Sequence, residues 1–519
     1  MILNKLDFKE TKKFSSLFLD YVQSEPNLKD FFNRFPSVEN FKPQIEQKQF
    51  SAENRKMLCQ DLERQYQGIQ PEPSLKKNLS LLAEPNTYTI TTGHQLNIFT
   101  GPLYFIYKIV TVINACKALS KAYPAYNFVP VYWMASEDHD FVEINHFRLE
   151  GKKYQWDTDQ TGAVGHFSTK SIQPLVNEIP GLPDFFKQAY AKNTLAEAVR
   201  NYVNHLFGKY GLVVIDADSK GLKSLFKGVI KDDIFKNTAK EKVTQCSDNL
   251  AKLGHNPQVF PRDINFFYLD ESIRGRIEEE NGRFKVVDTS LEFSKEELLA
   301  LIENSPEKFS PNVILRPLYQ EMILPNLAYV GGPGELAYWF QLKPMFESYK
   351  TSFPILLPRN FGMVVPDHIL RKIEKAQLSW KDLFEKKEQL QKRIALENAS
   401  GEVLLNGQID ELMKLFSKIK EQAASIDQTL IAHVEAQGTK TKSKLEGIEK
   451  KFIRAEKRKQ SDRLRQVDEI LDYLFPNGGL QERTDNFLNF YLSNPSFIDN
   501  LLMDFDPFDF RFNIMSNGK

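Results

Sequence analysis

Five apolar segments, each followed or closed by polar residues, limit most strongly what this chain can fold into. They read YTITT, NFVPVYWMAS, LVVIDAD, NLAYVGG and FPILLPR, and they occupy residues 88–92, 127–136, 212–218, 326–332 and 353–359. Helical stretches separate them, including one from about Leu103 to Tyr123. Apolar runs that alternate with helices are typical of a parallel sheet covered on both faces. We therefore predict an α/β core built on such a sheet.

Two segments interrupt this alternation, and the chain changes character near each end. Residues 146–168 and 266–288 predict β-hairpin insertions, the second with an Asn281-Gly282 turn. The first 85 or so residues predict mainly helices. We expect the core with these helices and insertions to span residues 1–365.

Apolar residues recur at alternating spacings of three and four after Asp367, in runs over 369–394, 409–430 and 445–455. This spacing predicts a coiled coil. Glycine-containing breaks at 397–408 and 435–441 could reverse the chain. We therefore expect a helical arm of antiparallel segments over 366–475, and a segment over 476–519 that packs back on the core or the arm.

Charge and cysteine content narrow the class of protein. Lys+Arg and Asp+Glu balance at 68 each in 519 residues, so net charge favours neither nucleic acid nor a membrane as partner. Cys59, Cys116 and Cys246 are far apart and odd in number, which argues for a reducing compartment and against a thiolate metal site. With no signal peptide or apolar span in view, we expect a cytoplasmic protein.

Polar residues at the five predicted strand ends indicate where a ligand would bind. Parallel sheets bind ligands beyond the carboxyl ends of their strands. We expect the following residues to converge on one crevice there: Thr92, Gly93, His94 and Gln95; Glu137, Asp138, His139 and Asp140; Asp216 and Asp218; Gly332, Gly334 and Glu335; and Arg359.

The first of these clusters suits an anion. Gly93 allows close backbone approach, the amides of the following helix can bind an anion, and His94 and Gln95 add hydrogen-bond donors for a phosphate or carboxylate. The alternative is a histidine that only caps a helix or lies satisfied in the core.

The second cluster, Ser-Glu-Asp-His-Asp, places three carboxylates and an imidazole within four residues. Their mutual repulsion is offset if they bind an ammonium group or a divalent metal. The spacing does not match a zinc pattern, so we expect no zinc and assign no metal ligands. The alternative is a solvated acidic loop.

The glycine-rich stretch has the form of a dinucleotide fingerprint. Gly332, Gly334 and Ala337 fit G-x-G-x-x-A, but the next strand ends in Arg359 instead of the acidic residue that binds a ribose. A nicotinamide enzyme is therefore disfavoured, and a helix N-terminus that binds phosphate or carboxylate beside Glu335 is the alternative. No Walker A sequence is present.

Arg316 and a basic run are the last two candidate binding features. Arg316 precedes a proline that favours extended backbone, and its apolar neighbours suit burial against an anion; the alternative is a surface ion pair. The basic run 440–465 is interleaved with acidic residues, which indicates a solvated coiled-coil face and not a nucleic-acid site.

The motifs TGHQLNIFTGPLYFIYKI, VYWMASEDHDFVEINHF, LVVIDAD, RPLYQEMILPNLAYVGGPGELAYW and LPR resemble those of the cysteine-adding enzymes of bacillithiol biosynthesis. The resemblance spans essentially the whole chain. It implies a Rossmann-like core with inserted connecting segments, and a C-terminal coiled coil that forms a homodimer. It also implies the last step of bacillithiol synthesis, in which L-cysteine is joined to glucosaminyl-malate.

The implied core is similar to that of class I aminoacyl-tRNA synthetases. Thr92-Gly93-His94-Gln95 would then take the place of their phosphate-binding histidine motif, although Leu96 and Asn97 follow where a second histidine is expected. The resemblance thus leaves open whether an adenylate forms.

The implied reaction assigns roles to the candidates. Amide formation needs an activated carboxyl group, for which we expect ATP, with Mg²⁺ as a possible companion. His94 and Gln95, with Thr92, Gly93, Gly332 and Gly334, would bind phosphates. Asp138 or Asp140 would hold the ammonium of cysteine, and His139 would accept a proton.

Arg316 or Arg359 would bind the malate carboxylates, and Glu137, Asp216 and Glu335 would complete the substrate site. The competing hypotheses are a nucleotide-binding accessory protein of the pathway and a coiled-coil scaffold.

Overall fold

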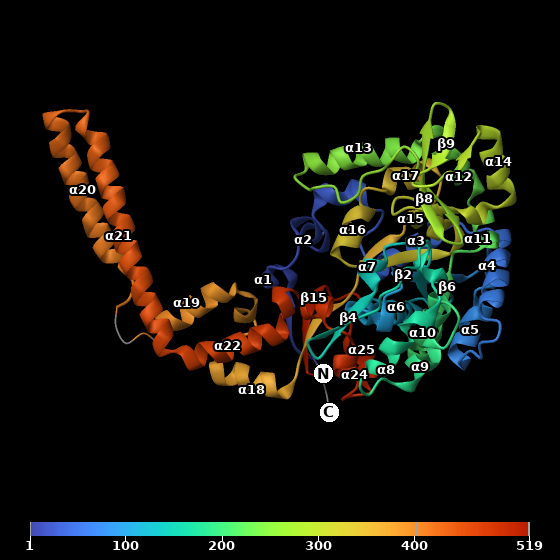
Figure 1. The fold of residues 1–519 in the computed structure, drawn as a ribbon, viewed down its shortest axis with the longest axis horizontal. Coiled ribbons are helices and arrows are strands. Elements are labelled where there is room, and N and C mark those ends of the chain that lie inside the picture. Colours follow the sequence, from blue (N-terminus) through green and yellow to red (C-terminus); the bar gives the residue numbers. More distant parts are fainter. Residues whose placement is uncertain (1, 398, 400–401, 517–519) are drawn as a thin grey trace. The chain divides into compact units, whose positions relative to one another are not determined.

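The computed structural model describes residues 2–397, 399 and 402–516, which form two compact units. The core unit runs to Val364 and resumes at Leu480, and the arm unit is Val365–Gly479. The arm unit is therefore an insertion, and the residues that follow it rejoin the core unit (Figure 1).

The central sheet of the core unit has five parallel strands in the order β13-β12-β2-β3-β6. Its strands are β2 (Thr87–His94), β3 (Asn127–Met134), β6 (Val213–Asp216), β12 (Asn326–Gly331) and β13 (Ile355–Pro358). All five strands predicted from apolar runs are confirmed.

Both faces of this sheet are covered, and β12 shows how. Ala328 and Val330 belong to one buried cluster with residues of α3 (Phe41–Gln47) and α6 (Tyr104–Ala122). Tyr329 lies between them in the sequence and so points to the opposite face. There its ring stacks on Trp339 of α16 (Pro333–Trp339), with centroids 4.6 Å apart. This two-sided burial explains why the strands are apolar throughout.

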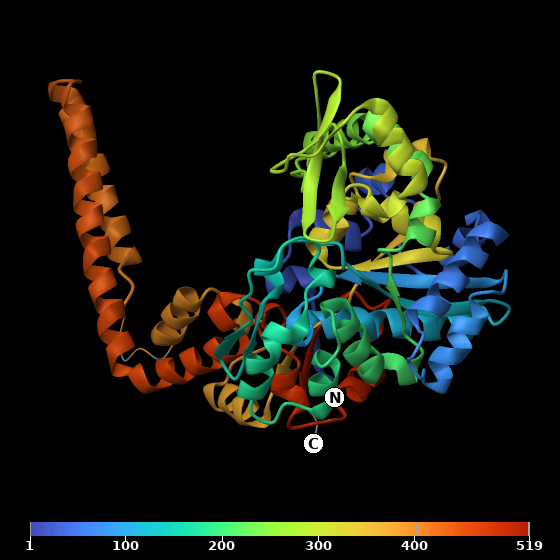
Figure 2. The same ribbon diagram turned by 45° about the vertical axis from the view of Figure 1, so that its right-hand side comes forward.

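The insertions form antiparallel structure. The first gives the hairpin of β4 (His146–Leu149) and β5 (Lys152–Gln155). The second is more than the hairpin that its sequence predicts, because it belongs to a five-stranded sheet in the order β10-β9-β8-β7-β11 (Figure 2). These strands are β7 (Phe266–Asp270), β8 (Ile273–Glu280), β9 (Arg283–Val286), β10 (Glu292–Phe293) and β11 (Phe309–Pro311). Asn281 and Gly282, both at positive φ, make the predicted turn.

A third sheet adds one strand to the N-terminal region, which is otherwise mainly helical, as expected. β1 (Ile2–Asp7) opens the described chain and pairs with β15 (Arg511–Ser516), which also pairs with β14 (Phe361–Val365). A strand whose partner lies at the other end of the sequence gives no local hairpin signal.

The other helices of the core unit surround these sheets. They are α1 (Phe8–Thr11), α2 (Ser16–Val22), α4 (Ala52–Gln65), α5 (Pro73–Leu81), α7 (Phe141–Ile144), α8 (Gln173–Glu178), α9 (Asp184–Tyr190), α10 (Leu195–Phe207), α11 (Lys220–Ser224), α12 (Lys227–Lys236), α13 (Thr238–Lys252), α14 (Lys295–Asn304), α15 (Arg316–Ile323), α17 (Lys343–Ser348), α23 (Gln481–Thr484), α24 (Leu488–Tyr491) and α25 (Phe497–Asp504).

The arm unit is helical, as expected, but its breaks differ from those predicted. Its helices are α18 (Asp367–Ala376), α19 (Lys387–Glu397), α20 (Asn406–Ile426), α21 (Leu430–Lys459) and α22 (Ser461–Leu474). The first apolar run is thus split between α18 and α19. The chain reverses at Asp427, whose carboxylate accepts the Thr429 N–H at 2.7 Å.

The predicted second break, 435–441, is wrong, because it lies inside α21. Of the predicted first break, residues 398, 400 and 401 fall outside the described part of the chain.

The surroundings of Gly438, the glycine in the predicted second break, explain why it does not interrupt α21. A Cβ at this position would lie 3.1 Å from Cγ of Phe416, so the glycine lets α20 and α21 approach closely. We expect Gly438→Leu to destabilise the arm unit by about 1–3 kcal/mol through overpacking. The control Gly447→Leu, on the same helix with open space around it, should stabilise by up to about 1 kcal/mol. Urea unfolding followed by circular dichroism would compare them, and equal effects of the two substitutions would contradict this account.

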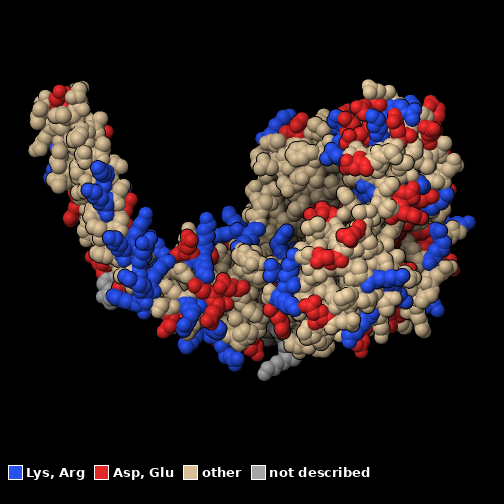
Figure 3. Space-filling model, in the orientation of Figure 1, with Lys and Arg blue, Asp and Glu red and all other residues tan. Residues whose placement is uncertain are grey.

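Charged side chains of both signs are mixed over the core unit, whereas lysine and arginine gather over the C-terminal part of α21 (Figure 3). This basic run is helical and partly paired, as in Lys459 with Glu456 at 2.6 Å, in agreement with a solvated helix face. In the part of the chain that the structure describes, no helix is both long and apolar enough to cross a membrane.

Candidate functional site

The strand order places a crevice between β2 and β12. From β2 the chain moves outward through β3 to β6, and it then returns to the other side of β2 with β12 and β13. Ligands of open parallel sheets bind where the order reverses in this way, beyond the strand ends. A first cavity of about 670 Å³ lies there. Its lining includes Gly93, His94, Gln95, Tyr104, Trp133, Arg316, Tyr329, Gly332, Gly334, Glu335, Arg359 and Arg483.

His94 ends β2 in the wall of this cavity, with its ring 5.3 Å from that of Tyr104. Its Nε2 atom is buried and has no hydrogen-bond partner. Burial, followed by the nearby Lys108 ammonium, lowers the pKa of His94 to about 3. The ring is therefore neutral at physiological pH, and it offers a ligand one hydrogen bond without a charge.

We expect this low pKa to appear in the pH dependence of stability. Between the ordinary value of 6.5 and the folded value of about 3, the unfolded chain binds a proton that the folded chain does not. His94 therefore reduces stability as the pH falls through this window, by up to about 1.4 kcal/mol per pH unit. His94→Gln should remove that contribution and flatten the curve of unfolding free energy against pH between 6.5 and 4. His433→Gln, on the exposed surface of α21, is the control, and equal slopes for both variants would refute the assignment.

Lys108 joins the two loops that flank the crevice. Its ammonium, buried within α6, donates to the carbonyl oxygen of Gly93 at 2.5 Å and pairs with Glu335 at 2.7 Å. Glu335 also accepts the Gly332 N–H at 2.9 Å and the Tyr329 hydroxyl at 2.7 Å. Burial alone would raise the pKa of Glu335, but Lys108 and these donors hold it at about 2. The charge of Glu335 is therefore neutralised inside the protein.

Two buried arginines of the first cavity have donor atoms without partners. Arg316 lies beside the rings of Trp133 and Tyr329, and Arg359 lies beside Tyr104. Nη2 of Arg316 and Nε of Arg359 are buried without a hydrogen-bond partner. Buried donors without partners are costly, so both atoms suit a bound oxyanion.

The backbone of Arg316 corrects the sequence expectation. Arg316 is the first residue of α15 and is not extended, because a proline in the first helical turn costs no hydrogen bond. The helix start directs its side chain into the crevice.

A second cavity of about 400 Å³ adjoins the first, and both are lined by Trp133, Ala135, Val313 and Arg316. The second cavity has an acidic wall of Glu137, Asp138 and Asp218, and Arg262, Arg274 and Arg316 also line it. Burial would raise the pKa of Asp138, but hydrogen bonds from His139 and Gln95 and the charge of Arg274 hold it well below its usual range. Asp138 is therefore ionised.

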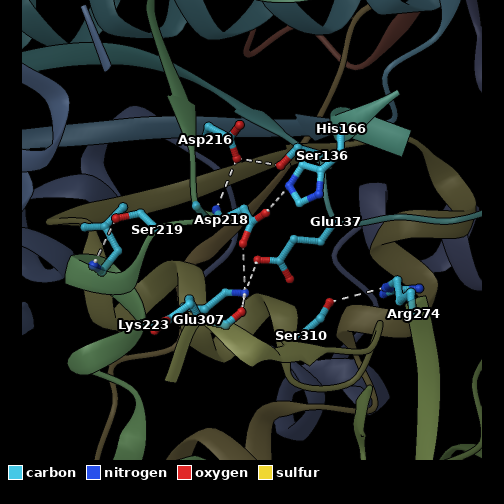
Figure 4. Close-up of polar contacts among 12 residues, drawn as sticks. Ser136, Glu137, His166, Asp216, Asp218, Ser219, Lys223, Arg274, Glu307 and Ser310 are labelled. Carbon is cyan, nitrogen blue, oxygen red and sulfur yellow. Dashed lines mark hydrogen bonds and ion pairs between the residues drawn. The ribbon is translucent and has the colours of Figure 1, made fainter. Parts of the chain in front are cut away.

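Lys223 links two carboxylates of the acidic wall. Its buried ammonium lies 2.9 Å from Glu137 and 3.2 Å from Asp218, and it donates to the carbonyl oxygen of Glu307 at 2.9 Å (Figure 4). On its other side, Asp218 meets Nε2 of His166 at 2.8 Å. Burial would raise the pKa of Asp218, yet Lys223 and His166 hold it at about 2.

Asp216 lies outside both cavities and lines a third, of about 420 Å³, with Asp218 and His166. It accepts a hydrogen bond from Ser136 at 2.5 Å. Burial, and then the charge of Asp218, raises the pKa of Asp216 to about 6.

The remaining predicted residues divide into those that support the cavities and those at the surface. The Thr92 hydroxyl donates to the Val330 carbonyl at 2.8 Å and so ties β2 to β12. The Gln95 amide donates to Asp138 at 3.0 Å and to Glu143 at 2.8 Å.

His139 and Asp140 are exposed and line none of the three cavities. Nδ1 of His139 lies 2.5 Å from a guanidinium nitrogen of Arg274.

Sequence reasoning missed several residues of the site: Lys108, His166, Lys223, Arg274, Glu482 and Arg483. A lysine within the apolar run of α6 is the one local signal among them, since a buried lysine needs an anionic partner. Within the described residues, no group of three or more His, Cys, Asp or Glu side chains is arranged to hold a metal ion.

Two family models together match nearly the whole chain. The model described as "Bacillithiol biosynthesis BshC, N-terminal Rossmann-like domain" matches residues 1–360, and the corresponding "C-terminal coiled-coil domain" matches residues 362–517. These matches confirm the fold class predicted from the sequence.

The sequences of several relatives align with this chain over almost its full length. Proteins named "Putative cysteine ligase BshC" are similar to this chain, with 44% identity in Flavobacterium psychrophilum, 42% in Flavobacterium johnsoniae and 41% in Christiangramia forsetii. The alignments cover 94%, 98% and 100% of this chain, and 94%, 99% and 100% of the relatives. The chain belongs to the BshC family of bacillithiol biosynthesis.

Proposed function

We propose that this protein is a ligase that joins the carboxyl group of L-cysteine to the amino group of glucosaminyl-malate, with ATP activating the carboxyl. The observation that carries the proposal is the pair of adjoining cavities, one basic and one with an acidic wall, with Arg316 lining both. A ligase that joins an amino acid to an anionic amine needs both kinds of surface next to each other.

The reaction has two balanced steps. A carboxylate oxygen of cysteine attacks a phosphorus of ATP, giving either an acyl phosphate and ADP or an acyl adenylate and pyrophosphate. The glucosamine nitrogen then attacks the acyl carbon, loses a proton to a base, and displaces phosphate or AMP. The site must therefore hold oxyanions, hold one ammonium group and accept one proton.

The first cavity suits the oxyanions. His94, Arg316 and Arg359 each present a buried nitrogen without a partner. The glycine backbone at Gly93 and Gly332 lets a ligand approach closely, since a Cβ at Gly93 would lie 3.6 Å from Arg316 and one at Gly332 the same distance from Arg359. Phosphates of ATP or the carboxylates of the malyl group would bind here.

The second cavity suits the ammonium of cysteine. Glu137 and Asp218 already share one ammonium, that of Lys223, while Asp138 faces the cavity beside Arg274. The ionised Asp138 is the proposed partner of the cysteine ammonium. His139, adjacent to Asp138, is the proposed proton acceptor and would have to turn from Arg274 toward the nitrogen.

We also propose that the protein acts in the cytoplasm as a homodimer formed by the arm unit. α20 and α21 expose apolar side chains of the kind that a second copy would cover, among them Leu415, Ile419, Ile426 and Phe452. The three cysteines are free, as expected for a reducing compartment.

The test combines a purified enzyme with a genetic deletion. Wild-type protein given L-cysteine, glucosaminyl-malate and MgATP should form the amide, detected as a labelled thiol by mass spectrometry. In cells, deletion should abolish bacillithiol and accumulate glucosaminyl-malate, and wild type but not His94→Ala should restore the thiol. If the purified protein binds nucleotide but forms no amide, and the deletion strain keeps its bacillithiol, the accessory-protein hypothesis replaces this one.

A further inference from the structure

α23 attaches the end of the chain to the first cavity. Gln481, its first residue, pairs with Val364 twice: the Val364 N–H donates to Oε1 at 2.7 Å, and Nε2 donates to the Val364 carbonyl at 3.0 Å. These bonds join the two points at which the chain leaves and re-enters the core unit. α23 is therefore fixed against β14.

Glu482, the next residue, is fully buried and holds Arg359. Its Oε1 accepts from Nη2 of Arg359 at 2.5 Å, and its Oε2 accepts the Gly362 N–H at 3.0 Å. Nη1 of Arg359 donates to the carbonyl oxygen of Asn360 at 2.9 Å. Both terminal nitrogens of Arg359 are thus occupied inside the protein, and Nε is left buried without a partner.

Arg483 follows and lines the same cavity. Its guanidinium carbon lies 6.0 Å from the centroid of the Tyr104 ring, and that of Arg359 lies 5.1 Å from the same centroid. Arg483 is exposed, and within the described residues it forms no ion pair. Two guanidinium groups therefore meet at one tyrosine ring, and only one of them has a carboxylate partner.

We infer that Arg359 and Arg483 form an arginine clamp that binds an oxyanion of a substrate in the first cavity, with Glu482 as the residue that positions it. Glu482 neutralises one of the two charges, and Lys108 and Glu335 neutralise each other. Arg316 and Arg483 then remain, against the single carboxylate of Glu143, so the cavity keeps an excess of one positive charge. An anionic group is the ligand that balances it.

The malyl dicarboxylate and a nucleotide polyphosphate share this chemistry, so the inference rests on the proposed function for the identity of the substrate. The clamp itself can be tested without turnover. L-Malate and inorganic pyrophosphate serve as probes for the two sources, measured by calorimetry on the full-length protein.

We expect Arg483→Met to weaken the binding of one probe about 10- to 100-fold, the loss typical of a charge-assisted hydrogen-bonded pair. The affected probe identifies the source of the oxyanion. Arg483→Lys, which keeps the charge but not the two-pronged geometry, should give an intermediate loss. Arg276→Met is the matched control, because Arg276 lies on β8 and lines none of the three cavities.

Glu482→Gln tests the positioning role. It should raise the KM for the substrate that carries the affected anion more than it lowers kcat. The melting temperature should fall as well, because the buried Arg359 loses its counter-charge, so both constants are measured at a temperature at which the variant is folded. Wild type that binds neither probe, or Arg483→Met that binds both as tightly as wild type, would overturn the clamp. Wild type that binds a probe through Arg483 but makes no amide would overturn the proposed function and leave the clamp intact.

Discussion

Replacement of Arg316 by methionine is expected to lower kcat/KM of the proposed ligation by about 100- to 1000-fold, the usual loss when one donor to a developing anion is removed. Arg316 is the charged residue that lines both the first and the second cavity. Its Nη2 atom has no partner in the protein, while Nη1 donates to Gln320 at 3.1 Å. Methionine fills much of the same volume between Trp133 and Tyr329, so the loss should fall on catalysis and not on folding.

The measurement is steady-state formation of the labelled thiol, with circular dichroism and melting temperature as checks on the fold. Arg276→Met, a substitution of the same type outside the cavities, should keep full activity. Arg316→Lys should lie between the two, because an ammonium keeps the charge but loses the planar fork. Activity of Arg316→Met within threefold of wild type would show that this guanidinium does not act on a reacting group.

Replacement of Glu335 by glutamine should cost about 3–5 kcal/mol of unfolding free energy, because it leaves the buried Lys108 ammonium without its counter-charge. The Lys108 side chain is 1% exposed, so water cannot replace the carboxylate. Glu178→Gln is the control: Glu178 pairs with Lys152 at the surface, where both side chains are more than half exposed, and its loss should cost less than about 1 kcal/mol.

The pH dependence of this variant has a defined sign. Burial lowers the pKa of Lys108, and Glu335 opposes that shift. Without Glu335 the pKa falls further, so the unfolded chain binds a proton that the folded variant holds weakly. Folding should therefore recover as the pH rises toward 10.5, the ordinary value for lysine.

Urea unfolding of wild type and Glu335→Gln at pH 7 and pH 9.5, followed by tryptophan fluorescence, should show a smaller difference at the higher pH. The double variant Lys108→Met with Glu335→Gln should regain part of the loss, since it removes the buried charge. A difference that stays constant with pH would mean that Lys108 is not the group left unpaired.

The central sheet could be predicted because its strands are buried on both faces, so each strand appears in the sequence as a local apolar run. Thr92 to Gln95 and Gly332 to Glu335 could also be assigned to one crevice, because the carboxyl ends of parallel strands lie at the same edge of the sheet. Val330 and Tyr329 illustrate this. They are neighbours in one strand and pack against helices on opposite faces of the sheet, so both are apolar.

The partners that complete the site could not be predicted, because they are distant in the sequence. Lys108 and Glu335 are separated by 227 positions, and Arg359 and Glu482 by 123. No periodicity links such residues. The prediction for His139 and Asp140 failed for a different reason. These residues are close to Asp138 in the sequence, but Asp138 lines the second cavity and its two neighbours lie at the surface.

The pairing of β1 with β15 has a consequence for how the protein is made. The ribosome makes β1 before every other described element and β15 after them, so the sheet that joins the two strands can form only once β15 has been made. α23, with Glu482 and Arg483, emerges just before β15. The parallel sheet can assemble earlier, yet the nascent chain lacks both the strand that pairs with β1 and the last wall of its binding cavity until α23 and β15 have been made. A ribosome that stalls within the arm would thus leave an inactive core with an unpaired strand edge, the kind of product that aggregates and is a target for proteolysis.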